Sequence, residues 1–268
     1  MRPLPGRLVL IGHPVSHSLS PAFQNAALRR AALPVRYELV DVLPSALDST
    51  LDTFIITNTW GNVTIPHKER VSARCSRVTP LAERVGAVNT FWIENGALVG
   101  DNTDVGGFLE LLRATAPDAD RAKPVALLGA GGAAAAVIAG LEEGGFVEVR
   151  VHSRSESRAA ALCSRFSTAR PVRRIDEAVR DACVVVNATP AGLDGVSMPV
   201  SIDMLDRCAT VVDLVVGRNE TPVVHAARAK GHRAADGLTM LLAQGALAFE
   251  RWFGVAPDRD VMRQAVAR

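Results

Sequence analysis

The stretch Val125-Ala-Leu-Leu-Gly-Ala-Gly-Gly-Ala-Ala-Ala-Ala136 decides the fold of this chain. A short apolar run ends abruptly in glycine, and Gly129, Gly131 and Ala134 then follow the G-x-G-x-x-G/A spacing. This order predicts a strand, a tight turn and a helix, with a backbone that a pyrophosphate can approach. The N–H groups at the helix start and the positive end of its dipole favour phosphate binding. We therefore predict that a dinucleotide binds at Gly129, Ala130, Gly131, Gly132 and Ala133.

Beyond this turn, short apolar segments alternate with segments of helical pattern. Strands separated by helices of such length are typical of a parallel, doubly wound sheet. The expected fold class is therefore α/β, with a Rossmann domain in this half. Strands are expected at 125–128, 148–151, near 172, at 183–187 and at 210–216, and helices at 133–143, 157–166, 175–180 and 226–230.

The residues before this half predict a second, open α/β domain. Ser20 followed by Pro21 is typical of a helix start, with Ser20 as the N-cap. The segment 45–60 is ambiguous, since 45–51 has a helical pattern and 54–57 holds strand-forming residues. The other expected strands are 8–12, 37–42, 63–65 and a hairpin pair, 91–93 and 97–99. Lys68 is expected at the start of the helix that follows the strand 63–65.

Two further segments organise the chain. The polar stretch 115–123 contains Pro117 and is a candidate linker directly before the glycine turn. Asp236 opens an apolar segment that predicts a long helix through Phe253, followed by a short final helix.

The composition limits the classes of function. Of 268 residues, 48% are hydrophobic and 22% are charged, which is typical of a globular protein, and the net charge is +2. The basic residues are scattered, so neither a nucleic-acid partner nor a membrane partner is expected. No apolar run approaches the roughly 18 residues of a membrane span, and the N-terminus lacks the apolar core of a secretory signal. We expect no metal, because the histidines lack ligand spacing. We expect a cytoplasmic protein, because its cysteines are dispersed and suit a reduced core: Cys75, Cys163, Cys183 and Cys208.

The segment after the second strand of the nucleotide half indicates which dinucleotide binds. An acid that binds the ribose 2′-OH of NAD is expected about 20 residues past the glycines. Here Ser153, Arg154, Ser155 and Arg158 occupy that region, and Glu156 comes too late in the loop. Guanidinium and hydroxyl groups suit a 2′-phosphate, which favours NADP. The alternative is an ordinary basic helix start.

Three polar clusters before residue 105 predict a site for a small, polyhydroxylated anion. They contain hydroxyls, amides and carboxylates, and one holds Lys68. Only three of the 30 basic residues are lysines, so a lysine retained here suggests chemistry that arginine cannot perform. A Lys–Asp pair can transfer a proton to a carbonyl oxygen as a hydride arrives.

These segments resemble the shikimate dehydrogenase family. The motifs occur in the family's order and cover almost the whole chain. The matching stretches are Gly12–Pro21 (GHPVSHSLSP), Asn62–Lys68 (NVTIPHK), Gly86–Thr90 (GAVNT), Gly100–Asp104 (GDNTD), Gly129–Ala133 (GAGGA), Asn187–Thr189 (NAT) and Asp236–Gln244 (DGLTMLLAQ).

The resemblance implies reversible, NADPH-dependent reduction of the ketone of 3-dehydroshikimate to shikimate, in chorismate biosynthesis. Lys68 and Asp104 would form the catalytic pair, and Ser18 and Ser20 would hold the substrate carboxylate. The ring and its hydroxyls would also contact Thr64, Asn89 and Gln244. The nicotinamide end would be lined by Thr189, Leu214, Gly237 and Met240.

The resemblance also implies two domains separated by a cleft, in a monomer or homodimer. The substrate-binding domain would be residues 1–104, completed by helices within 238–268. Residues 105–237 would form the NADP-binding domain.

Each site residue also has a purely structural interpretation. Ser20 alone would be a helix cap, Asn89 a turn residue and Gln244 a core amide. Asp101 and Asp104 would both be solvated loop acids. His67 lies beside Lys68 but is a weak candidate for an acid.

One position departs from the family pattern. The strand 211–216 usually ends in D-x-x-Y, and that tyrosine touches the substrate, but this chain has Val216 and its only tyrosine is Tyr37. The change could weaken substrate binding or indicate a quinate or aminoshikimate dehydrogenase. A non-catalytic ligand sensor of the same fold is a further alternative, against which the retention of Lys68 and Asp104 argues.

Overall fold

The computed structural model describes residues 4–217 and 219–267. The chain divides into two compact units, one formed by the residues up to Thr103 together with 242–267, and the other by residues 104–241. Each unit is built on a six-stranded sheet. The α/β class expected from the sequence is confirmed.

The first unit contains a mixed sheet in the order β2-β1-β3-β5-β6-β4. Its first three strands pair parallel, β5 is antiparallel to both β3 and β6, and β4 is parallel to β6. The strands are β1 (Arg7–Gly12), β2 (Tyr37–Asp41), β3 (Thr59–Val63), β4 (Arg77–Val78), β5 (Thr90–Glu94) and β6 (Ala97–Asp101). The helices are α1 (Ser20–Arg30), α2 (Leu47–Ile56), α3 (Lys68–Arg74), α4 (Pro80–Val85), α10 (Leu238–Phe253) and α11 (Arg259–Gln264), with a short 3₁₀ helix at Pro44–Ala46. Helix α10 belongs to this unit from residue 242 onward.

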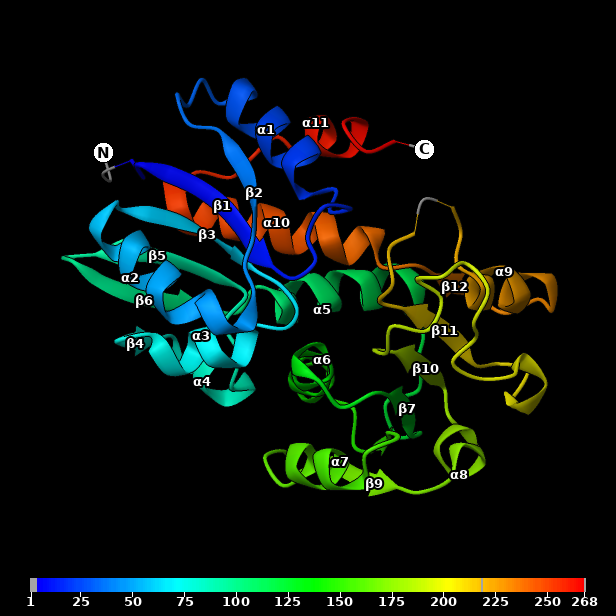
Figure 1. Ribbon diagram of the computed structural model, residues 1–268. Coiled ribbons are helices and arrows are strands. Elements are labelled where there is room, and N and C mark those ends of the chain that lie inside the picture. Colours follow the sequence, from blue (N-terminus) through cyan, green and yellow to red (C-terminus); the bar gives the residue numbers. More distant parts are fainter. Residues whose placement is uncertain (1–3, 218, 268) are drawn as a thin grey trace. The chain divides into compact units, whose positions relative to one another are not determined.

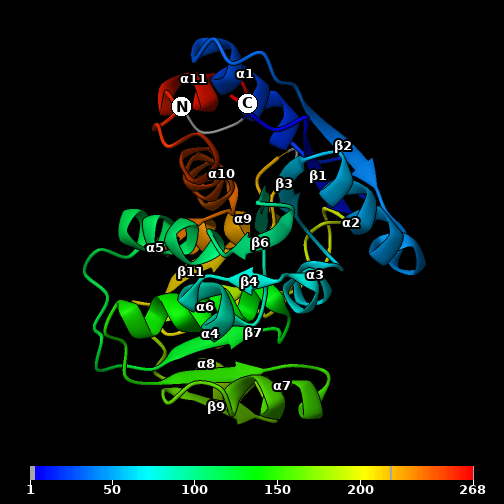
Figure 2. The same cartoon turned by 90° about the vertical axis from the view of Figure 1, so that its left-hand side faces the viewer.

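The end of the chain completes the core of this first unit. Helices α1, α10 and α11 lie on one side of the sheet, and α2 and α3 lie on the other (Figure 1). Figure 2 shows α1 and α11 side by side, as their many contacts require. Gln24 of α1 donates a 2.9 Å hydrogen bond to the carbonyl of Gly245 in α10. Segments more than 200 residues apart in sequence therefore form one hydrophobic core.

The structure corrects one assignment at the start of α1 and resolves the ambiguous segment 45–60. Helix α1 begins at Ser20 with Leu19 as its N-cap, so the Ser20 hydroxyl is not the cap. Instead, the Ser18 hydroxyl accepts a hydrogen bond of 3.2 Å from the Ser20 N–H. Residues 54–56 belong to α2 despite their β-propensity, because Leu47, Leu51 and Phe54 are buried at helical spacing.

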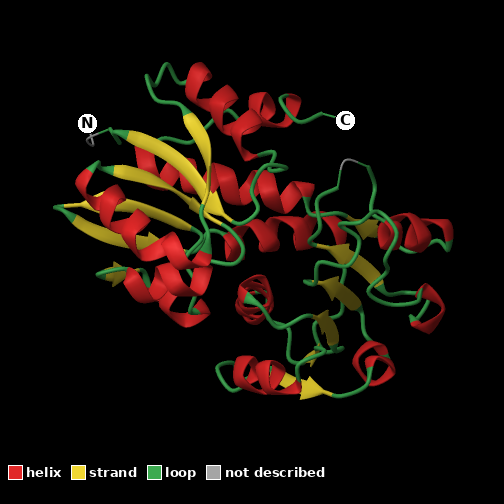
Figure 3. Cartoon of the chain, in the orientation of Figure 1, coloured by secondary structure: helices red, strands yellow, loops and turns green. Residues whose placement is uncertain are grey.

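The second unit contains an all-parallel sheet in the order β12-β11-β10-β7-β8-β9. In order along the chain, this is the 3-2-1-4-5-6 arrangement of a Rossmann domain. Helices α5, α6 and α7 cover one face and α8 and α9 the other (Figure 1), and Figure 3 shows the strands between these helices. The strands are β7 (Val125–Leu128), β8 (Val149–His152), β9 (Ala169–Val172), β10 (Val184–Asn187), β11 (Thr210–Asp213) and β12 (Ala234–Ala235). The helices are α5 (Asp104–Thr115), α6 (Gly132–Glu143), α7 (Glu156–Cys163), α8 (Ile175–Val179) and α9 (Pro222–Ala229), with a 3₁₀ helix at Ile202–Met204.

Three further expectations need correction. The stretch 115–123 is not a linker between units, because it joins α5 to β7 inside the second unit. Strand β11 ends at Asp213 rather than at Val216. Cys208 is exposed, unlike the buried Cys163 and Cys183.

Candidate functional site

The glycine turn leaves an approachable backbone at the start of α6. Gly129 has a φ of +116°, and a Cβ there would lie 2.8 Å from the carbonyl oxygen of Ala188, so this position requires glycine. A Cβ at Gly131 would meet no described atom within 4 Å. Ala134 is fully buried, which lets the helix lie close to the sheet. Gly132 and Ala133 begin the helix, so their N–H groups suit a phosphate.

The loop after β8 presents the predicted 2′-phosphate residues. Ser155 is the N-cap of α7, and its hydroxyl accepts a hydrogen bond from the Arg158 N–H. Arg154 and Arg158 are exposed, and neither side chain has an ion-pair partner among the described residues. Glu156 forms an ion pair of 3.2 Å with Arg173, which partly neutralises the one acid of this loop. The loop therefore offers two available guanidinium groups to an anion.

A buried network fixes the ends of β10 and β11, and no local sequence pattern predicts it. The Asn187 amide donates to Asp213 at 2.8 Å, and the Thr221 hydroxyl donates to the same carboxylate at 2.6 Å. The Thr189 hydroxyl donates to Asn187 Oδ1 at 2.6 Å. Burial raises the pKa of the Asp213 carboxyl, although hydrogen bonds from Thr221, the Val215 N–H and Asn187 oppose this effect. The network holds Thr189 at the carboxyl edge of the sheet, where Rossmann domains bind ligands.

The predicted nicotinamide residues flank this network. A Cβ at Gly237 would lie 2.4 Å from the Leu214 carbonyl oxygen, so only glycine allows the two segments to approach. Met240 is buried in the first turn of α10. Val216 is half-buried in the loop after β11 and lies 3.1 Å from the position of that Cβ.

In the first unit, an anchored loop carries Ser18. His13 Nδ1 lies 2.6 Å from Asp41 Oδ1, and this hydrogen bond lowers the pKa of the Asp41 carboxyl. The Val15 N–H donates to Asp41, and the Ser18 N–H donates to the Val15 carbonyl. The loop is thereby held against the end of β2, with Ser20 buried at the start of α1.

The segment after β3 places Thr64 and Lys68. The Thr64 N–H donates to the Ile11 carbonyl at 2.8 Å, which continues the parallel pairing with β1. Lys68 begins α3, as expected, and its carbonyl accepts a 3.0 Å hydrogen bond from the Val88 N–H. The Lys68 backbone is therefore bonded to the residue directly before Asn89. His67 is fully buried with Nε2 2.6 Å from the Val42 carbonyl, which suits a structural role.

Asn89 is the centre of a buried polar cluster. Its amide donates to the Thr103 hydroxyl at 2.9 Å and to Gln244 Oε1 at 3.2 Å, and its Oδ1 accepts from the Thr103 N–H at 2.7 Å. The Asn62 amide donates to the Asn89 carbonyl at 3.0 Å. The structure thus brings together Asn89 and Gln244, which are 155 residues apart. Neither is a simple turn residue or an isolated core amide.

Asp104 is buried at the start of α5, directly after Thr103. By the division of the chain it is the first residue of the second unit. The predicted cofactor residues all belong to this second unit, and the other predicted substrate residues belong to the first.

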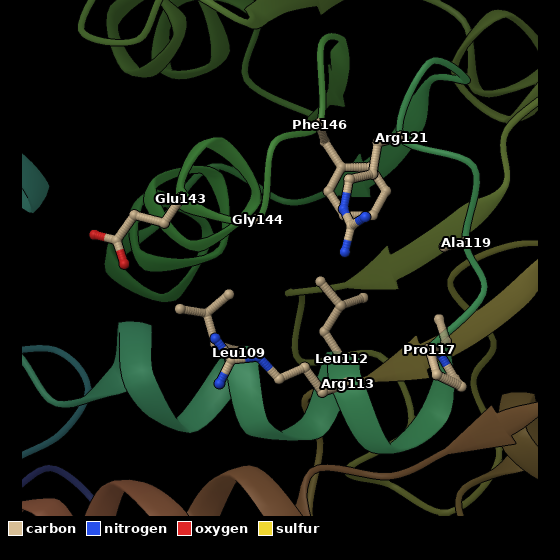
Figure 4. A pocket seen from close by; sticks show the side chains of 10 residues that line it. Leu109, Leu112, Arg113, Pro117, Ala119, Arg121, Glu143, Gly144 and Phe146 are labelled. Atoms are coloured by element: carbon tan, nitrogen blue, oxygen red, sulfur yellow. The ribbon is translucent and has the colours of Figure 1, made fainter.

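No predicted site residue lines the one pocket described here. It has a volume of about 180 Å³, and Figure 4 shows Leu109, Leu112 and Arg113 of α5 on one side and Glu143 and Phe146 on the other. Across residues 4–217 and 219–267, no cluster of three or more His, Cys, Asp and Glu side chains could hold a metal ion. Within the same ranges, no helix is long and apolar enough to cross a membrane.

Comparison with known families accounts for nearly the whole chain. Residues 10–91 match the shikimate dehydrogenase substrate binding domain, residues 110–239 match shikimate / quinate 5-dehydrogenase, and residues 237–267 match the shikimate 5'-dehydrogenase C-terminal domain. The NADP(+)-dependent shikimate dehydrogenase of Rhodospirillum rubrum is 42% identical over an alignment of 270 residues. The alignment covers 96% of this chain and 95% of the relative. The chain belongs to the shikimate dehydrogenase family.

Solved structures of shikimate dehydrogenases share the fold. The enzyme of Thermus thermophilus, in complex with NADP(H) and shikimate, is 41% identical with a TM-score of 0.88, covering 97% of this chain and 98% of that one. The enzyme of Aquifex aeolicus is 36% identical with a TM-score of 0.90, covering 98% of both chains. A quinate dehydrogenase of Corynebacterium glutamicum in complex with NAD is 31% identical with a TM-score of 0.88, covering 96% of this chain and 97% of that one. The resemblance drawn from the sequence motifs is confirmed.

Proposed function

We propose that this chain catalyses the reversible reduction of 3-dehydroshikimate to shikimate with NADPH. The observation that carries the proposal is the 41% identity, over 97% of the chain, to the Thermus thermophilus enzyme solved with NADP(H) and shikimate. As in that family, the chain would be a biosynthetic oxidoreductase. We also propose that it acts in the cytoplasm, as a monomer or homodimer.

The residues of the second unit fit NADP. The open backbone at Gly131 and the start of α6 suit the pyrophosphate, and Ser153, Arg154, Ser155 and Arg158 suit the 2′-phosphate. Thr189, Leu214, Gly237 and Met240 would contact the nicotinamide. When bound, the cofactor supplies or accepts the hydride. Residues 105–237 would form this NADP-binding domain.

The residues of the first unit fit a small anion that carries hydroxyl groups. Ser18 and Ser20 would bind the carboxylate, and Thr64, Asn89 and Gln244 would bind the ring hydroxyls. Residues 1–104 and the helices within 238–268 would form the substrate domain. The Asn89 cluster supports this role, because hydrogen bonds among its own side chains hold the amides in place.

Lys68 and Asp104 would transfer the proton that accompanies the hydride. During reduction, the Lys68 ammonium would donate a proton to the oxygen that was the ketone. During oxidation, the neutral amine would accept the proton from the hydroxyl. Asp104 would orient the ammonium and hold it close to the reacting oxygen. A lysine can perform both steps, whereas an arginine stays protonated.

The proposal is tested by following NADPH absorbance at 340 nm with shikimate or quinate and with NADP or NAD. Fast reduction of NADP by shikimate alone would support it. Preference for quinate would favour the second candidate, a quinate dehydrogenase, which Val216 and the similarity to the Corynebacterium glutamicum enzyme suggest. No turnover in any combination would favour a ligand sensor.

A further inference from the structure

A buried carboxylate lies at the end of β6, beside the predicted substrate residues. Only 3% of the Asp101 side chain is exposed. Its carboxylate accepts hydrogen bonds from the Asn102 N–H at 2.8 Å and from the Thr79 hydroxyl, and it forms an ion pair of 2.6 Å with Arg251 of α10. A buried carboxylate is costly unless it is paired, so Arg251 compensates a charge that the fold has already buried.

Asp101 is joined directly to the Asn89 cluster. The Asn89 N–H donates to the Asp101 carbonyl at 3.1 Å, and the Thr103 N–H donates to Asn89 Oδ1 at 2.7 Å. The Asn102 amide donates to the Ala87 carbonyl at 2.8 Å. A displacement of Asp101 would therefore displace the partners of Asn89.

Arg251 and Gln244 lie on the same face of α10. They are seven residues apart, which is nearly two helical turns and about 10.5 Å along the axis. Gln244 contacts Asn89 and Arg251 contacts Asp101, so two side chains of one helix contact two adjacent points of the first unit. Together with the hydrogen bond from Gln24 to the Gly245 carbonyl, these two contacts fix the position and the rotation of the helix beside Asn89.

We propose that Arg251 is a positioning residue, whose ion pair with Asp101 fixes α10 so that Gln244 meets Asn89 in the substrate site. The inference rests on the proposed function, because that function gives Gln244 its role. In this role Arg251 would act without touching substrate. Its effect is carried through α10 to Gln244.

The test replaces Arg251 with methionine, which keeps an apolar stem of similar length and removes the charge. R251M should raise the KM for shikimate about fivefold to tenfold and leave the KM for NADP within about twofold. R251K, which keeps the charge, should restore most of the affinity. The matched control is R263M, because Arg263 forms an exposed ion pair of 2.7 Å with Asp260 in the same C-terminal segment. R263M should leave both KM values unchanged.

A double-mutant cycle separates positioning from a general loss of stability. If Arg251 acts through Gln244, R251M should change the KM for shikimate by less than about twofold in a Q244A background. A full KM increase in that background would overturn the proposal, as would an unchanged KM in R251M alone. If the unmodified chain does not reduce NADP with shikimate, the proposed function fails and this inference fails with it. Normal activity of the unmodified chain with an unaffected R251M overturns only the role of Arg251.

Discussion

The hydroxyl of Tyr37, the only tyrosine of the chain, donates a 2.8 Å hydrogen bond to Oδ1 of Asn62. Both residues are buried, and the amide of Asn62 in turn donates to the Asn89 carbonyl at 3.0 Å. Burial raises the pKa of the Tyr37 phenol well above its ordinary value, so the phenol stays protonated and remains a donor. The first strands of the sheet are thereby connected to the Asn89 cluster.

Tyr37→Phe should lower the free energy of unfolding by about 1–3 kcal/mol, because it leaves a buried amide oxygen without this donor. Urea denaturation measures the change. The control is Thr53→Val, which removes an exposed hydroxyl that bonds the Ser49 carbonyl on α2. That control should change stability by no more than about 0.5 kcal/mol. Equal stability of Tyr37→Phe and the unmodified chain would show that the Asn62 oxygen finds another partner.

Lys68→Ala should reduce kcat by about 10²- to 10⁴-fold, because it removes the proposed proton donor. NADPH affinity, measured by titration, should change little. Lys230→Ala is the matched control, since Lys230 pairs with Asp203 on the surface of the second unit. Near-normal turnover in Lys68→Ala would remove Lys68 from the mechanism.

Asp104→Asn should lower kcat and weaken shikimate binding together, because the proposed carboxylate both orients Lys68 and contacts substrate. Steady-state kinetics with varied shikimate separates the two effects. Asp118→Asn serves as the comparison, since Asp118 is exposed and pairs with Arg233. If Asp104→Asn changed neither parameter, the proposed pair would be incorrect.

The unmodified chain should bind NADP at least about tenfold more tightly than NAD, because two guanidinium groups can pair with the 2′-phosphate. Replacing Arg154 and Arg158 together with alanine should remove most of that preference. Arg174→Ala should not, because Arg174 pairs with Asp176 after the next strand. Equal or tighter NAD binding by the unmodified chain would refute the assignment.

Asp213→Asn should change how stability depends on pH. Because the folded-state pKa of Asp213 is raised, the native state holds this proton more tightly than the unfolded chain does. Its contribution to stability is therefore greatest at low pH and declines as pH rises through the window above about 3.9. Asparagine removes the charge, keeps one oxygen that can accept from Asn187 and the Val215 N–H, and places a donor NH2 group where the Thr221 hydroxyl now donates. The stability of Asp213→Asn relative to the unmodified chain should thus increase with pH across that window.

Asp194→Asn gives the opposite sign and completes this test. Hydrogen bonds from the Val196 and Ser197 N–H groups lower the pKa of the Asp194 carboxyl. Its stabilising contribution is present above about 3.9 and is lost as pH falls through the lowered value. Asp194→Asn should therefore lose stability relative to the unmodified chain as pH rises. Urea denaturation at several pH values measures both variants, and parallel profiles for the two would contradict the assignment.

Local patterns predicted the parts of the molecule that depend on neighbouring residues. The glycine turn, the helix start at Lys68 and the hairpin around Asn95 and Gly96 are short-range features, and the structure contains each of them. The N-cap assignment of Ser20 was wrong because the dipeptide Ser-Pro suits either a cap or a first helical turn. Helix α1 already includes Ser20, and the Ser18 hydroxyl accepts a hydrogen bond from the Ser20 N–H.

Long-range contacts could not be predicted from such patterns. Val216 follows β11 rather than belonging to it, because Asp213 accepts the Val215 N–H and ends the strand. Asp101 resembled a solvated loop acid, since its partner Arg251 is 150 residues further along the chain. The hydrogen bond between Tyr37 and Asn62 could not be predicted from either segment alone.

The return of α10 and α11 to the first unit has a consequence for synthesis on the ribosome. Residues 104–241 are contiguous, so this unit can fold as soon as it leaves the exit tunnel. Phe23 and Gln24 of α1 are buried against a helix that is translated more than 200 residues later. The first unit therefore cannot complete its core until α10 and α11 have been translated, and the face of α1 that carries Phe23 and Gln24 lacks its packing partner until then.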